Sequence, residues 1–273
     1  MTSDRTRDSA VHSRALLRAL PFAGFAAIAA IALAWGDLLP GGYRLRGLVG
    51  AEARDRRELA LHAAERLSSF AATNARIAPG SVVFVGSSTI ERFPLAERFP
   101  GKPCVNHGIL SASVPMIERF LDVLAPSVPS ASFVLYAGSI DLRDPDLTHA
   151  VGAARRAASA RADEVAAQVR ALLDDVRREH PDAAIALIGV LPARRMSAED
   201  VVALARLNAS LHAAADERGI AFVDTARAPI TSPAGSLAED QSADDLHLDE
   251  HGYATLAAWI VSGGGEPGRR LAP

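Results

Sequence analysis

The sequence has only one cysteine, Cys104, among its 273 residues. A single thiol excludes an internal disulfide, a Cys-x-x-Cys redox pair and a zinc site built from several thiolates. Aromatic residues are also scarce, at 5% of the chain, although 49% of all residues are hydrophobic. The core of a domain of this length must therefore be built mainly from Ala, Val, Leu and Ile.

The sequence also lacks an excess of either charge. The formal net charge is −3, the isoelectric point is near 6.2, and basic and acidic residues are interspersed along the chain. Binding to nucleic acid relies on an accumulation of positive charge, which this composition does not provide. We therefore expect no nucleic-acid partner.

One long run without charged residues lies near the N-terminus. It extends from Ala19 to Trp35 and follows a tail, residues 1–18, that contains four arginines. At about 1.5 Å per residue the run covers roughly 25 Å, and adding residues 36–39 lets a helix cross the roughly 30 Å hydrocarbon core of a bilayer. The run therefore predicts a membrane-targeting segment over 19–39, in preference to a buried helix of the core.

Two fates of this segment are open. The Ala-Leu-Ala at 32–34 has the small-x-small form of a signal-peptidase site, which would release a secreted protein. The apolar run is longer than the usual core of a signal peptide, which favours an uncleaved anchor. We expect a membrane-anchored protein whose domain lies outside the cytoplasm, because short N-terminal tails usually stay inside. Secretion after cleavage is the alternative.

Residues 52–76 have the pattern of an exposed helix, with apolar residues at helical spacing and many charge pairs four residues apart. Pro79 and Gly80 end this pattern, because neither residue favours the interior of a helix. The predicted organisation is a tail over 1–18, an anchor or signal segment over 19–39, a helical linker over 40–79 and one domain over 80–273.

Beyond residue 80, short apolar runs rich in β-formers alternate with helical patterns. The runs are apolar almost throughout, which indicates strands buried on both faces. This alternation predicts an α/β protein of three layers, with a five-stranded parallel sheet between two layers of helices. Such sheets bind ligands at the carboxyl ends of their strands. The predicted strands are 81–86, 103–106, 132–137, 184–190 and 220–224, and the predicted helices begin near 88 and cover 114–124, 160–179, 198–218 and 250–262.

Two serines, Ser87 and Ser88, follow the first predicted strand in the stretch SVVFVGSSTIERF at 81–93. Ser88 and Glu91 have the spacing of a capping box, which gives a purely structural reason for a serine at the start of a helix. The stretch lacks the glycine patterns of phosphate-binding turns, and Ile90 stands where the G-x-S-x-G nucleophile elbow has its second glycine. The local pattern leaves both helix capping and catalysis open.

A second chemical pattern lies in SADDLHLDEHGYATLA, where Asp244 and His247 stand three residues apart just before the last predicted helix. A serine nucleophile needs a base to take its proton, and a histidine base needs a carboxylate to fix its tautomer. An isolated D-x-x-H is common, and such a histidine is usually a surface or capping residue. The predicted sheet brings Ser88 and the D-x-x-H to the same edge, which favours a triad of Ser88, His247 and Asp244.

At these residues the sequence resembles the SGNH, or GDSL-like, hydrolases, in a form similar to bacterial members related to platelet-activating-factor acetylhydrolase. FVGSSTI resembles the first block of the family, which makes Ser88 the nucleophile and puts Ser87 in place of the aspartate of that block. CVNHGILSAS resembles the second block through Asn106 and Gly108. Ser111 then stands where the family has a glycine whose amide binds the oxyanion.

Two more stretches extend the resemblance, which covers about Ser81 to Ala258. VLYAGSIDL resembles the third block through Gly138 and Asp141, and DDLHLDEHGY resembles the fifth block and contains Asp244 and His247. The resemblance implies the flavodoxin-like fold of the family, with the predicted triad at the carboxyl edge of the sheet.

The third block departs from the family at Ile140, because the family has an asparagine there whose amide donates to the oxyanion. The main-chain N–H groups of Ser88 and Ser111 remain as donors, and loss of one donor typically costs roughly 2.7–4 kcal/mol of transition-state stabilisation. Ser139 is either a substitute donor or a turn residue. His107, in the second block, either faces the site or lies on an exposed loop, and we expect the loop.

The resemblance implies an ester hydrolase that uses Ser88 as nucleophile and needs no metal or organic cofactor. Members of the family act on lipid esters, thioesters and O-acetylated sugars, so an ester-bearing small molecule, a lipid or an acylated glycan is the expected partner, with the membrane contacted through the N-terminal segment. The alternative is a non-catalytic domain of the same fold that binds glycan or lipid or serves as a scaffold in the envelope. Ile140 favours this alternative, whereas the retained Ser88, Asp244 and His247 favour the hydrolase.

Overall fold

The computed structural model describes residues 51–143, 158–242 and 244–273, and the chain divides into two compact units, Met1–Leu61 and His62–Pro273. The predicted helix over 52–76 is found as α3 (Ala51–Thr73), which ends in the 3-10 turn η1 (Asn74–Arg76). The predicted segment 19–39 lies outside the described residues. Of the helices in the described ranges, none is long and apolar enough to cross a membrane. The four predicted segments of the chain stay predictions.

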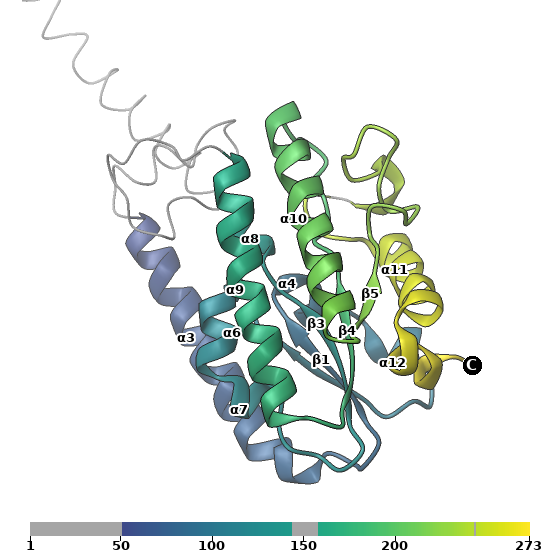
Figure 1. The fold of residues 1–273 in the computed structure, drawn as a ribbon. Helices are drawn as coiled ribbons and strands as arrows, with labels where there is room; N and C mark the ends of the chain where they lie inside the picture. The colour runs from purple at the N-terminus through teal and green to yellow at the C-terminus, as the bar shows by residue number, and fades with distance from the viewer. Residues whose placement is uncertain (1–50, 144–157, 243) are drawn as a thin grey trace, which may run out of the picture. The chain divides into compact units, whose positions relative to one another are not determined.

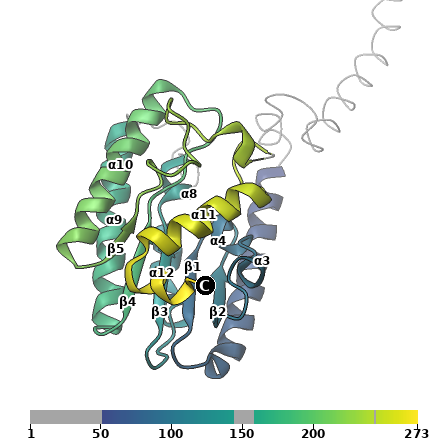
Figure 2. The same cartoon turned by 90° about the vertical axis from the view of Figure 1, so that its right-hand side faces the viewer.

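The second unit contains the predicted five-stranded parallel sheet, with the strand order β2-β1-β3-β4-β5 (Figures 1 and 2). All pairs of neighbouring strands are parallel. Gly86, at the end of β1, pairs with Gly108 of β2 and Tyr136 of β3, so these three strands end together at one edge. The strands are β1 (Val82–Gly86), β2 (Cys104–Gly108), β3 (Ser132–Tyr136), β4 (Ala184–Ile188) and β5 (Ala221–Val223), close to their predicted positions.

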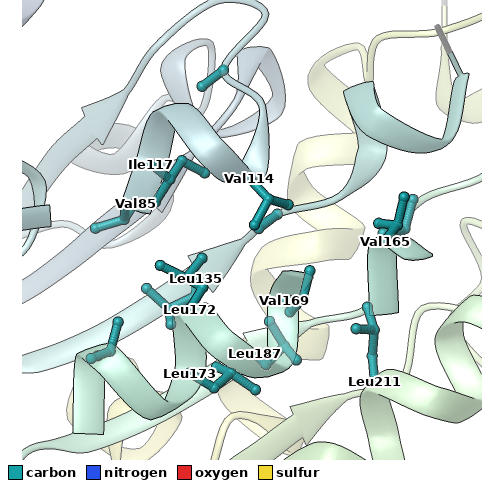
Figure 3. Packing of buried hydrophobic residues seen from close by; sticks show 14 of the residues in the cluster. Val85, Val114, Ile117, Leu135, Val165, Val169, Leu172, Leu173, Leu187 and Leu211 are labelled. Carbon is teal, nitrogen blue, oxygen red and sulfur yellow. The ribbon is translucent and has the colours of Figure 1, made fainter. Parts of the chain in front are cut away.

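Both faces of the sheet are buried, which explains why its strands are almost uniformly apolar. Successive side chains of a strand point to opposite faces. Val83 and Val85 of β1 therefore belong to one hydrophobic cluster, whereas Val82 and Phe84 belong to another on the opposite face. Figure 3 shows part of the first cluster, in which valine, leucine and isoleucine side chains interdigitate. Aliphatic packing of this kind fills the core with few aromatic residues.

The two clusters are covered by different helices, as Figures 1 and 2 show. The first cluster contains buried residues of α6 (Val114–Arg119), α9 (Ala158–Glu179) and α10 (Ala198–Glu217). The second contains residues of α11 (Glu250–Gly263) and α12 (Gly265–Leu271). The predicted three-layer α/β/α architecture is thereby confirmed.

The prediction of one helix over 114–124 was wrong in detail. The backbone leaves the helical region at Phe120, with φ −116° and ψ 28°, and separates α6 from α7 (Leu121–Leu124). Several short helices lie in the segments that connect the strands to the longer helices or to the next strand. They are α4 (Ser88–Glu91), α5 (Leu95–Arg98), α8 (Ser139–Arg143) and η2 (Glu239–Gln241).

Candidate active site

Helix α4 begins at Ser88, and only Ser87 separates it from the end of β1 at Gly86. Ser87 is its N-cap, and the Ser87 carbonyl accepts bonds from the N–H groups of Ile90 and Glu91. The Ser87 hydroxyl makes no capping bond and lies 3.2 Å from the hydroxyl of Ser139, with both side chains buried. The Ser88 hydroxyl has no hydrogen-bond partner among the residues that the structure describes, and the Ser88 residue is 8% exposed.

The capping-box interpretation of Ser88 and Glu91 is wrong for two reasons. Ser88 is the first residue of the helix, whereas a capping serine precedes it. The Glu91 carboxylate does not reach back to the cap, because it accepts a bond from the N–H of Leu110 and lies 2.8 Å from Nε2 of His62. Ser88 therefore has no role in capping α4, and its position needs another explanation.

Asp244 and His247 form the hydrogen-bonded pair that the sequence predicts. Oδ2 of Asp244 lies 2.7 Å from Nδ1 of His247. Oδ1 of the same carboxylate accepts bonds from the main-chain N–H groups of Leu246, at 3.1 Å, and His247, at 2.7 Å. These main-chain bonds hold the carboxylate in the turn before α11, so the orientation of the imidazole is fixed by local structure.

The pair sets the tautomer of His247. An ionised carboxylate only accepts hydrogen bonds, so Nδ1 carries the proton and Nε2 of the neutral ring is the basic atom. Desolvation opposes ionisation of Asp244, but the hydrogen bonds from His247 and Leu246 outweigh it and lower the pKa of the carboxyl to about 2. The carboxylate is therefore charged throughout the neutral range, as a residue that orients a histidine base must be.

This lowered pKa predicts how stability depends on pH. Because the folded pKa lies below the ordinary value of 3.8, the ionised carboxylate stabilises the fold above about pH 4, and this stabilisation is lost as the pH falls towards 2. We expect Asp244→Asn to lower the free energy of unfolding at pH 6, and the difference from the wild type to shrink between pH 4 and 2. Urea unfolding at several pH values measures it, and a difference that grows in acid would contradict the assignment.

Contacts of the C-terminal region place the Asp244–His247 pair near α4. The Tyr253 hydroxyl, on α11, donates to the carbonyl of Thr89 at 3.0 Å. A guanidinium nitrogen of Arg92 lies 3.9 Å from Oδ2 of Asp244. Arg92 follows Ser88 by one helical turn, and its N–H donates to the Ser88 carbonyl. The D-x-x-H turn therefore lies against the helix that begins at Ser88.

The second predicted link of the triad, between His247 and Ser88, is not closed. His247 and Ser88 make no hydrogen bond with each other in the described structure, although catalytic hydrogen bonds are often long in the absence of substrate. The structure therefore brings Asp244 and His247 into contact with each other. Ser88 lies at the start of α4, the helix next to their turn.

Ser111 has the backbone conformation that its predicted role requires. Its φ is 58°, in the left-handed region where glycine is favoured, so the turn keeps the shape that a glycine would give it. The turn is anchored by a bond from the N–H of Ile109 to the carbonyl of Gly86, at 2.9 Å. Ser111 is only partly buried, so its main-chain N–H belongs to an accessible loop at the carboxyl edge of the sheet.

Asn106 and Gly108 have structural roles in the same region. Nδ2 of Asn106 donates to the carbonyl of Ile90 at 2.7 Å, and Oδ1 accepts from the N–H of Gly108 at 2.9 Å. A Cβ on Gly108 would lie 2.1 Å from the main-chain nitrogen of Glu91. These residues fasten α4 closely against β2, and the Asn106 amide is occupied by this contact.

The third-block residues lie on α8, at the end of β3. The Asp141 carboxylate accepts from the N–H of Val114 at 3.0 Å, which ties α8 to the start of α6, and burial raises the pKa of Asp141. Gly138 has a φ of 93°, which explains why glycine precedes α8. Ser139 is 2% exposed and faces Ser87, so its hydroxyl is not at the surface, whereas Ile140 is only partly buried.

The expectation that His107 lies on an exposed loop is wrong. His107 belongs to β2 and is 1% exposed. Its Nδ1 donates to the carbonyl of Leu124 at 2.8 Å, its ring lies 4.3 Å from the ring of Phe70, and burial lowers its pKa. His107 is a satisfied core residue and does not face the site.

A set of contacts from α3, which the sequence did not predict, links the segments that contain Ser88 and Ser111. His62 contacts Glu91, and Glu91 in turn holds the N–H of Leu110, next to Ser111. Arg66 donates two bonds to the carbonyl of Gly108, at 3.2 and 2.9 Å. The available signal was the spacing of His62 and Arg66, which puts both on one face of α3. These contacts connect the helix of Ser88 to the turn of Ser111.

A sequence model of the GDSL-like lipase/acylhydrolase family matches residues 90–255, more than half of the chain. The chain belongs to this family. The match includes the Asn106, Asp141 and His247 regions and begins two residues after Ser88. No curated protein matches the sequence of this GDSL-like protein.

Solved structures of other proteins have the same fold as this family member. A candidate platelet activating factor from Streptococcus pneumoniae is similar with a TM-score of 0.66 and 21% identity, over 78% of this chain and 98% of that one. A GDSL-like lipase from Bacteroides thetaiotaomicron has a TM-score of 0.53 and 20% identity, over 72% and 95%. An acetyl xylan esterase has a TM-score of 0.52 and 16% identity, over 67% and 98%. At these identities the likeness establishes the fold of this GDSL-like protein.

Proposed function

We propose that this GDSL-like protein is a serine ester hydrolase with Ser88 as nucleophile, His247 as base and Asp244 as the residue that orients the base. The observation that carries the proposal is the bond from His247 to Asp244, because it uses Nδ1 and leaves Nε2 without a hydrogen-bond partner among the described residues, in a turn that lies against the Ser88 helix. A histidine in this state is suited to accept a hydroxyl proton.

The proposed reaction has two steps. Ser88 Oγ forms a bond to the ester carbonyl carbon while its proton moves to Nε2 of His247, and the resulting imidazolium returns that proton to the departing alcohol. Water then attacks the acyl-serine by the same proton route and releases the acid. Main-chain N–H groups of Ser88 and Ser111 are the donors we assign to the oxyanion, and Ile140 contributes none.

The proposed substrates are esters of lipids, thioesters or O-acetylated glycans. The last of these is supported by the fold shared with an acetyl xylan esterase. For the N-terminal residues we keep the proposal of an anchor or signal segment over 19–39 that places the domain outside the cytoplasm. A protein held by an uncleaved anchor stays in the membrane fraction after a carbonate wash, whereas a new N-terminus near Trp35 would identify a cleaved signal.

Labelling by a fluorophosphonate probe tests the proposed nucleophile. The probe reacts only with an activated hydroxyl, so we expect the wild type to be labelled and Ser88→Ala to be unlabelled. Ser87→Ala is the matched control, because it removes the neighbouring hydroxyl and leaves the proposed triad in place; it should retain labelling. Labelling that persists in Ser88→Ala, or that is absent from a well-folded wild type, would reject the proposal.

A further inference from the structure

A cavity of about 230 Å³ lies at the carboxyl ends of β3 and β4. Its walls come from the end of α8, the first turns of α9 and α10 and the loop that follows β4. Leu142, Leu191, Met196 and Leu204 make much of this wall apolar. Ser88, Asp244 and His247 are not among its lining residues, so the cavity is separate from the proposed catalytic groups.

The lining also carries three arginines against one acidic residue, Asp200. Arg195 is compensated, since its Nε lies 3.0 Å from Oδ2 of Asp245. Arg143 donates to the carbonyl of Leu191, which carries no charge. Nε of Arg161 is buried without a hydrogen-bond partner. Among the described carboxylates, none pairs with Arg143 or Arg161.

A partly buried guanidinium without a counter-charge is costly, and it is well suited to bind a carboxylate or phosphate through paired hydrogen bonds. Asp200 does not fill this role, because its carboxylate accepts from the Ser197 hydroxyl at 2.7 Å at the start of α10. Glu199 accepts from the N–H of Ala158 at 3.2 Å. These bonds leave both carboxylates charged, but neither pairs with Arg143 or Arg161 in the part of the chain that the structure describes, so both guanidinium groups are available to an anionic ligand.

Two segments connect the cavity to the surroundings of the proposed catalytic groups. Leu142 and Arg143 follow Asp141 directly on α8. The loop after β4 is bonded to the D-x-x-H turn, where the N–H of Arg194 donates to the carbonyl of Asp245 at 2.8 Å and its guanidinium lies 3.1 Å from the Asp245 carboxylate. The loop that lines the cavity is therefore bonded to the turn that carries His247, and the helix that lines it also contains the third-block residue Asp141.

We propose that this cavity binds an anionic group, a carboxylate or a phosphate, that the ester substrate carries beyond the bond to be cleaved, with Arg161 and Arg143 as its partners. The apolar residues of the wall contact the short chain between the anion and the ester. The inference rests on the proposed function, because it assigns the cavity as a subsite for the same substrate.

Calorimetric titration with butyrate and with butyl phosphate tests the site, and butanol serves as the neutral comparison. We expect at least one of the two anions to bind and butanol not to bind, and the stronger anion identifies the charged group. Arg161→Gln should weaken anion binding roughly tenfold, as expected for loss of a charged hydrogen bond, and Arg161→Lys should restore part of it. Arg170→Gln, an exposed arginine of the same helix, should leave binding unchanged. Binding of neither anion, or equal binding by Arg161→Gln, would overturn the proposal.

The kinetics of a charged and a neutral aryl ester separate this proposal from the proposed function. An aryl ester that carries a terminal carboxylate should have a lower KM than the neutral ester, and Arg161→Gln should raise the KM of the carboxylate ester, whereas Arg170→Gln should not. If Ser88 is labelled but the protein binds no anion, the subsite is rejected and the proposed hydrolase function is retained. Anion binding that depends on Arg161, in a protein without labelled Ser88, supports the anion site and rejects the hydrolase.

Discussion

Replacing His247 with alanine is expected to lower kcat for a short-chain aryl ester by roughly 10³- to 10⁴-fold, because the Ser88 hydroxyl then has no base within reach. The fold should change little, since the one described side-chain bond of His247 is to Asp244, in the same turn. Steady-state kinetics with purified protein measure the effect, and thermal unfolding shows whether the variant is intact.

The matched control is His251→Ala. His251 lies on α11, one turn after His247, and its imidazole is 63% exposed and 3.7 Å from Asp240. It has no part in the proposed reaction, so its replacement should leave kcat within about twofold of the wild type, as is usual for exposed residues away from a site. A folded His247→Ala protein that retained a third of the wild-type activity would reject His247 as the base.

Ile140→Asn is expected to increase turnover, because it restores the amide donor that the family has at this position. One oxyanion donor is typically worth about 10²- to 10³-fold in kcat. We expect a gain of a few-fold to at most 10²-fold, because a newly introduced side chain lacks the supporting contacts that position a native oxyanion donor. KM should change little, since the donor acts mainly on the charge that develops in the transition state.

Ile140→Leu is the control for Ile140→Asn, because leucine has nearly the shape of asparagine and cannot donate a hydrogen bond. Ile140 is only partly buried, so an amide there keeps some contact with water, and thermal unfolding should be measured in parallel. If Ile140→Asn folds well and is no faster than Ile140→Leu, the missing donor does not limit this protein. Activity that also persists in Ser88→Ala would indicate that the measured turnover does not come from the proposed site.

The sheet could be predicted from the sequence because its signal is local and repeated. Each strand is a short apolar run between helical patterns, and burial on both faces makes the runs apolar at every position, as Val82, Val83, Phe84 and Val85 show. Helix α12 could not be predicted, because its sequence GEPGRRL contains two glycines and a proline. It is held by packing of residues such as Leu271 in the second cluster, which overrides weak helix propensity.

The Asp244–His247 contact could be predicted for a similar reason, since residues three apart in a tight turn are close in any fold. The roles of Glu91 and His107 could not, because they depend on residues distant in the sequence. Glu91 has the spacing of a cap, yet its partners are Leu110 and His62. His107 lies between Asn106 and Gly108 in the sequence, yet Leu124 and Phe70 contact it in the core. Periodicity reports which face of an element is buried, but it does not report which distant group meets a side chain there.

The interior position of β1, between β2 and β3, has a consequence for where this protein can be divided. The family match begins at residue 90, after β1, whereas β1 is the strand that joins β2 to β3. A fragment limited to 90–255 would leave the facing N–H and C=O groups of β2 and β3 without partners and would split the sheet into separate pieces. The part of the sequence that matches the family model is therefore not a folding unit by itself. Strand β1 is needed to hold the sheet together, and it also leads into the helix that begins with the proposed nucleophile, Ser88.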